Sequence, residues 1–162
     1  DLKNKSNDTR SSYSFENIFE VVYHKAANIL LPYFVNSSVT PNQVTLVSGL
    51  FGVAGAILLM LPSYTALFFS AIFIHIYSIF DSLDGQLAKT KNLSSPFGMW
   101  LDIFFDKFND FLLVVGLTLG VYFRTSDVRL LFLGILLMGF VFSVQFLLAI
   151  INLLFKKHML IY

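Results

Sequence analysis

The sequence lacks cysteine and contains little charge. Without cysteine among its 162 residues, disulfide bonds and thiolate metal ligands are excluded. Charged residues make up 13% of the chain, about half of the roughly 25% that is usual in soluble proteins. The formal net charge is +1, which gives no reason to expect a nucleic-acid partner.

Apolar side chains are abundant instead. Hydrophobic residues reach 56% and include 19 phenylalanines, against roughly 45–50% apolar residues in soluble proteins. A soluble fold of this size has too little interior to hide that much apolar surface. We therefore expect an all-α integral membrane protein, with membrane lipids as its solvent.

The N-terminal part differs from the rest. Residues 1–13 are polar with mixed charge, so we expect a flexible tail and recognise no cleavable signal peptide. Residues 14–35 carry apolar side chains at helical spacing, but charged residues on the other faces and Pro32 disfavour a membrane span. This pattern predicts an amphipathic helix that lies in the membrane interface.

Four hydrophobic stretches follow, and with the interfacial helix they are expected to form a single membrane domain over residues 14–162. A helix needs about 20 residues to cross the hydrocarbon core. The stretches cover residues 43–61, 64–84, 99–123 and 128–155. A polar loop at 89–97 separates the second from the third. The sequence thus predicts a polytopic transmembrane helix bundle.

Lysine and arginine are unevenly distributed between the two ends of these spans. Only Arg124 and Arg129 lie on one side. Eight lie on the other: Lys3, Lys5, Arg10, Lys25, Lys89, Lys91, Lys156 and Lys157. The positive-inside rule therefore predicts that the tail, the 89–97 loop and the C-terminus face the cytoplasm.

Small residues recur every four positions in two of the spans. They are Ser48, Gly52 and Ala56 in the first, and Gly116 and Gly120 in the third. Such spacing lets helices approach closely. Packing inside one bundle and contact between two copies in a homodimer are both compatible with it.

Half of the acidic residues fall within one thirty-residue stretch: Asp81, Asp84, Asp102, Asp106 and Asp110. Spacings of three and four place Asp81 with Asp84, and Asp102 with Asp106, on one face of their helices. The intervening loop turns the chain back, so the two pairs can face each other near the membrane surface. Such a cluster requires cations, and carboxylate oxygens favour Mg²⁺, Mn²⁺ or Ca²⁺ over zinc. Helix capping or pairing with lysines would explain one or two carboxylates only.

Asp81-x2-Asp84-Gly85-x2-Ala88-Lys89, followed by eight residues and then Gly98-x3-Asp102-x3-Asp106, resembles the signature of the CDP-alcohol phosphotransferases. The signature of this family, also called CDP-alcohol phosphatidyltransferases, is D-x2-D-G-x2-A-R-x8-G-x3-D-x3-D. Seven of its eight fixed positions match, and Lys89 stands where the family has arginine. The resemblance covers residues 14–155 and includes Pro41-Asn42-x2-Thr45.

The resemblance implies a helical membrane enzyme that usually has six spans, of which four are visible here. It implies transfer of a phosphatidyl or other substituted phosphoryl group from a CDP-linked lipid donor to an acceptor alcohol. In the family, aspartates hold two divalent ions, Mg²⁺ or Mn²⁺, against the donor diphosphate. The last aspartate deprotonates the acceptor, and CMP leaves.

Residue by residue, the resemblance makes Asp81, Asp84 and Asp102 metal ligands, and Asp106 the catalytic base with a contact to metal. The nucleotide site would comprise Gly85, Ala88, Lys89 and Gly98, together with Asn42 and Thr45. Lys91 and Lys107 are candidates for binding the acceptor. Asp110 either orders the base or supports the structure.

Two other functions stay open. An intramembrane Mg²⁺-dependent prenyltransferase also binds a diphosphate between aspartates, although its aspartate motifs lie several helices apart and here 17 residues separate Asp84 from Asp102. A non-catalytic cation-binding membrane component would bind metal without releasing CMP.

Overall fold

The computed structural model describes residues 15–159, and the side chains of residues 18–147. These residues form five helices and no strand. The helices are α1 (Phe15–Val35), α2 (Pro41–Met60), α3 (Tyr64–Thr90), α4 (Pro96–Thr125) and α5 (Arg129–Met159). The all-α class is confirmed. The tail expected at residues 1–13 lies outside the described residues.

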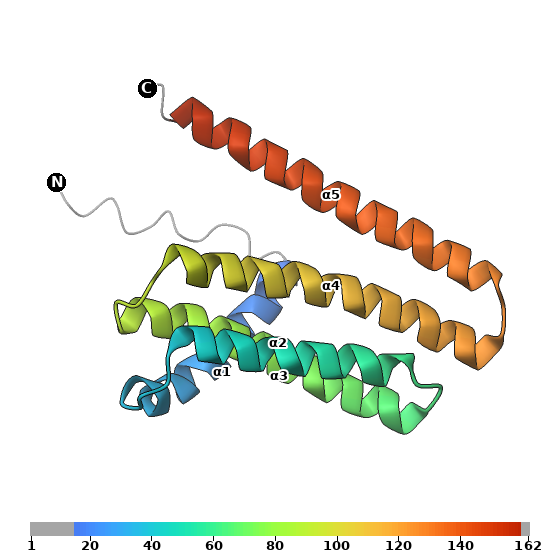
Figure 1. Cartoon of the computed structure of the whole chain (residues 1–162), viewed down its shortest axis with the longest axis horizontal. Coiled ribbons are helices and arrows are strands. Elements are labelled where there is room, and N and C mark those ends of the chain that lie inside the picture. The colour runs from blue at the N-terminus through green and yellow to red at the C-terminus, as the bar shows by residue number, and fades with distance from the viewer. Residues whose placement is uncertain (1–14, 160–162) are drawn as a thin grey trace.

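Three helices form the centre of the molecule. α2 packs along both α3 and α4, while α1 packs against α3. α5 turns back beside α4 and then diverges from it toward the C-terminus (Figure 1). Ala27 of α1, Val44 of α2, and Leu83 and Leu87 of α3 form a buried cluster where the first three helices meet. The cluster fixes the end of α3 that carries Asp84.

Helix boundaries follow from local signals. Thr40 caps α2 in a capping box with Gln43, and Ser95 caps α4 by accepting a hydrogen bond from the Gly98 amide at 3.0 Å. Proline occupies the first turn of both helices. α3 runs to Thr90, beyond the expected end at residue 84, and it ends just before Asn92, which adopts a left-handed φ of 55°. The loop is therefore shorter than the predicted 89–97.

Among the described helices, α2, α3 and residues Arg129–Leu147 of α5 are long and apolar enough to cross a membrane. α4, predicted as a span over 99–123, does not reach that level because Asp102, Asp106, Lys107 and Asp110 lower its apolarity. It nevertheless packs along α2. α1 is also not among the candidate spans, and its position in the interface stays a prediction.

The small residues bring α2 and α4 into close contact. A Cβ added to Gly116 would lie 2.6 Å from the carbonyl oxygen of Ala56, and one added to Gly120 would overlap the carbonyl oxygen of Leu59. At Gly52 it would lie 2.5 Å from Cγ of Asn109. Packing inside one bundle therefore accounts for the small residues. A homodimer stays a prediction.

Candidate metal and nucleotide site

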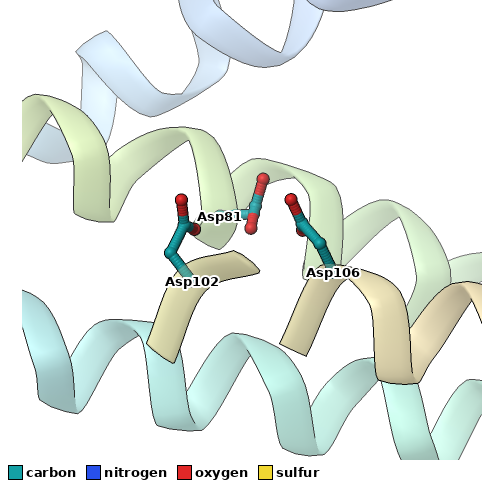
Figure 2. A group of neighbouring side chains, drawn as sticks. All are labelled: Asp81, Asp102 and Asp106. Carbon is teal, nitrogen blue, oxygen red and sulfur yellow. The ribbon is translucent and has the colours of Figure 1, made fainter. Parts of the chain in front are cut away.

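Three carboxylates converge between α3 and α4. Asp81 projects from α3, and Asp102 and Asp106 project from α4 toward it (Figure 2). One oxygen from each lies within 4.8 Å of the other two, and all three residues are half-buried. Of the first aspartate pair, Asp81 thus faces both members of the second pair, Asp102 and Asp106, whereas Asp84 does not join them.

This cluster fits a divalent ion. Three negative groups at this separation and burial repel one another strongly, and a bound cation removes that repulsion. All of the donor atoms are carboxylate oxygens, which suit hard cations such as Mg²⁺, Mn²⁺ and Ca²⁺. The donor set does not select among these three ions.

Asp84, the fourth expected ligand, is placed differently. It is 4% exposed, next to the buried Leu83, and it is not one of the three converging residues. Its Oδ2 has no hydrogen-bond partner among the described residues. A buried carboxylate oxygen normally has a partner, so Asp84 is suited to a cation or ligand beside it. Its role as a metal ligand stays a prediction.

A cavity of about 510 Å³ adjoins the carboxylates, within the range of roughly 300–1,000 Å³ typical of ligand sites. Asp84 and Asp102 line it. All six residues assigned from the sequence to the nucleotide site also line it: Asn42, Thr45, Gly85, Ala88, Lys89 and Gly98. The fold thus gathers residues from α2, α3 and α4 around one space.

The two glycines of the motif serve different purposes. A Cβ added to Gly85 would meet no described atom within 4 Å, so the backbone there opens directly onto the cavity. A Cβ added to Gly98 would lie 2.8 Å from Oδ1 of Asn42. Gly98 therefore makes room for the Asn42 amide, and it also lines the cavity.

Sequence reasoning missed part of the cavity wall, namely Pro41, Leu93, Ser94, Ser95, Pro96 and Met99. Most of these residues lie in the loop before α4 or in its first turn. Ser95 before Pro96 is a recognisable helix-start signal, and it could have indicated that the N-terminus of α4 reaches the site. The N-termini of α2 and α4 both border the cavity, where their dipoles favour an anion.

The two lysines near the end of α3 make different contacts. Lys89 lines the cavity. The ammonium of Lys91 donates hydrogen bonds to the carbonyl oxygens of Ser37 at 2.9 Å and Val39 at 2.7 Å, which ties the end of α3 to the loop before α2. Lys91 does not line the cavity, and its role in acceptor binding stays a prediction.

Lys107 lies on a different face of α4. It borders a separate surface depression together with Trp100 and Phe104. These two aromatic rings stack along the helix, with centroids 5.5 Å apart and planes at 18°. The ammonium of Lys107 is 3.7 Å from a carboxylate oxygen of Asp110. Its role in acceptor binding likewise stays a prediction.

Asp110 links two helices. Gln145 of α5 donates a hydrogen bond from Nε2 to Oδ2 of Asp110 at 2.8 Å. Of the two roles left open for Asp110, structural support is therefore favoured.

Asp106 accepts a hydrogen bond from Tyr77, whose hydroxyl donates to Oδ1 at 2.8 Å.

The fold and site define an integral membrane protein with a carboxylate cluster beside a ligand-sized cavity. Its sequence matches the CDP-alcohol phosphatidyltransferase pattern over residues 38–160. The chain belongs to this family.

Relatives agree with this assignment. A bifunctional IPC transferase and DIPP synthase of Aquifex aeolicus is 33% identical over 95 residues, which cover 59% of this chain and 21% of the relative. The phosphatidylinositol phosphate synthase of Corynebacterium glutamicum is 34% identical over 76 residues, 47% of this chain and 34% of the relative. An uncharacterised Aquifex aeolicus protein is 32% identical over 117 residues, 70% and 58% of the two chains. The chain thus spans between about a fifth and three fifths of the length of these relatives.

Proposed function

We propose that this protein transfers a phosphatidyl or other substituted phosphoryl group from a CDP-linked donor to an acceptor alcohol, with release of CMP. The donor we favour is CDP-diacylglycerol, which places the reaction in phospholipid biosynthesis. The observation that carries the proposal is the meeting of three carboxylates beside a cavity lined by all six nucleotide-motif residues.

The cavity accommodates the cytidine nucleotide. Gly85 places no side chain in the cavity, and Lys89 offers a positive charge to the diphosphate. Lysine is a point charge, whereas the arginine usual in the family presents a planar fork, so the phosphate contact differs in geometry. The amide ends of α2 and α4 add a favourable dipole for the same anion.

Asp81, Asp102 and Asp106, together with Asp84, are the residues that would hold two divalent ions, Mg²⁺ or Mn²⁺. Such ions neutralise charge on the diphosphate and on the leaving CMP. The oxygen ligands and their separation support this assignment.

Asp106 is the proposed general base. Its carboxylate accepts the proton of the acceptor hydroxyl. The acceptor oxygen then forms a bond to the phosphorus that carries the donor alcohol, and the bond from that phosphorus to the CMP oxygen breaks. CMP leaves with the electron pair of that bond.

The carboxylates lie toward the end of the bundle that the positive-inside rule assigns to the cytoplasm. A lipid donor can reach this site from the membrane and a polar acceptor can reach it from water. Inositol phosphate is the first acceptor to test, because one relative is a phosphatidylinositol phosphate synthase.

The test is CMP release by the whole protein in lipid nanodiscs, with CDP-diacylglycerol, Mg²⁺ and a panel of acceptor alcohols. Asp106→Asn should lower kcat by about 10²- to 10⁴-fold, the usual contribution of a general base, while donor binding persists. Asp110→Asn is the matched control, one turn further along α4, and should retain most turnover.

Three outcomes would contradict the proposal. Metal binding without CDP binding or CMP release identifies a non-catalytic cation-binding protein. Transfer from a labelled prenyl diphosphate identifies a prenyltransferase. Full turnover by Asp106→Asn removes the base from the scheme.

A further inference from the structure

A tyrosine from the neighbouring helix holds the Asp106 carboxylate. Tyr77 lies on α3, one helical turn before Asp81, and its hydroxyl donates to Oδ1 of Asp106 at 2.8 Å. This bond joins α3 to α4, the two helices from which the carboxylates converge, and it is partly buried. No motif position pointed to Tyr77.

The chemistry of this bond gives it an orienting effect. A phenol hydroxyl has one proton to donate, and an ionised carboxylate only accepts. A hydrogen bond to a carboxylate that is ionised, as a metal-ligating carboxylate is, is stronger and more directional than one between neutral groups. With Oδ1 held by Tyr77, rotation of the Asp106 side chain is restricted, and the lone pairs of Oδ2 are not used by this bond.

The helices themselves do not depend on this bond for their alignment. Asn109 is fully buried one turn beyond Asp106 and packs directly on the backbone at Gly52 of α2. Gly116 continues this close contact along α4. Since backbone packing already fixes α4, the Tyr77 hydroxyl acts on the orientation of one side chain.

We propose that Tyr77 is a positioning residue for Asp106. Its hydroxyl holds the Asp106 carboxylate toward Asp81 and Asp102, ready for a divalent ion and, if the proposed function holds, for the acceptor proton. Partners of this kind, which hydrogen-bond a metal ligand, typically change metal affinity or activity 10- to 100-fold when removed.

The deciding experiment is Mn²⁺ binding to the whole protein in nanodiscs, measured by electron paramagnetic resonance. Tyr77→Phe should weaken Mn²⁺ binding about tenfold. Tyr23→Phe is a matched control, because the Tyr23 hydroxyl lies 2.8 Å from Nδ1 of His75, also on α3 but away from the aspartates. It should change the affinity by less than about twofold.

A double-mutant cycle tests whether the effect passes through Asp106. In an Asp106→Asn background, Tyr77→Phe should cause no further loss of Mn²⁺ affinity. Equal weakening in both backgrounds would overturn the inference, as would unchanged affinity in the single variant. Failure of Tyr77→Phe to fold would show that the hydroxyl serves the fold, and it would also overturn the inference.

Turnover supplies a second, separable measurement. At saturating Mn²⁺, Tyr77→Phe should lower kcat about 10- to 100-fold and leave the donor KM within about twofold, because the orientation of the base matters after binding. If the unaltered protein releases no CMP, the proposed function fails, while the Mn²⁺ cycle still decides the role of Tyr77. If the unaltered protein binds no Mn²⁺, the inference fails as well.

Discussion

Gly85→Ala separates the effect of a side chain on the fold from its effect on the ligand. Gly85 is inside α3, and an added Cβ would meet no described atom within 4 Å. Alanine in a helix is about 0.5–1 kcal/mol more favourable than glycine. The variant should therefore unfold about 1–4 °C higher than the unaltered protein.

Ligand binding should change in the opposite direction. The same Cβ points into the cavity, where a bound nucleotide would have to move away from it. Overfilling a packed contact costs about 1–3 kcal/mol, which corresponds to a loss of about 5- to 150-fold in CDP affinity. The variant should thus be more stable and bind CDP more weakly.

The assay is isothermal titration of CDP with Mg²⁺ into protein in nanodiscs, alongside a thermal unfolding scan. Gly139→Ala is the matched control, because Gly139 lies inside α5, where an added Cβ also meets no described atom within 4 Å. It should gain similar stability and keep its CDP affinity. Unchanged CDP affinity in Gly85→Ala, or an equal loss in both variants, would refute the placement of the nucleotide.

Two further predictions concern packing and metal. Gly116→Ala should lower the unfolding temperature, with a loss of about 1–3 kcal/mol, because its Cβ would lie 2.6 Å from the Ala56 carbonyl oxygen; a rise like that of Gly139→Ala would contradict the α2–α4 contact. Saturating Mg²⁺ or Mn²⁺ should stabilise the protein, by about 2.7 kcal/mol at one hundred times Kd, and Asp81→Asn should remove most of that gain. If the metal stabilised Asp81→Asn as much as the unaltered protein in the thermal scan, the carboxylate cluster would be excluded as the metal-binding site.

The sequence predicted the convergence of Asp81, Asp102 and Asp106 because helical periodicity and a short loop determine it. The spacing of Asp84 from Asp81 said nothing about its burial, since that depends on how α1 and α2 cover Leu83 and Leu87. Position along a helix predicts which residues share a face, and it does not predict what covers that face.

Roles that depend on contacts between helices could likewise not be predicted from the sequence. Lys91 carries a charge near the site, but its ammonium donates hydrogen bonds to backbone carbonyl oxygens of the α1–α2 loop. Gly98 matches the motif, yet the reason for it is the Asn42 side chain on another helix. Tyr77 belongs to no motif, and only the three-dimensional placement of α3 and α4 shows that its hydroxyl reaches Asp106.

Trp100 is the single tryptophan of the chain. It is 58% exposed on α4, two residues before Asp102, and is stacked against Phe104. Its fluorescence is therefore an intrinsic optical reporter of this segment, with no label required. Quenching by lipids brominated at defined acyl positions would measure how deep the indole sits in the bilayer. Because Asp102 lies two residues further along the same helix, the depth of the indole would also give the depth of the carboxylates relative to the lipid headgroups.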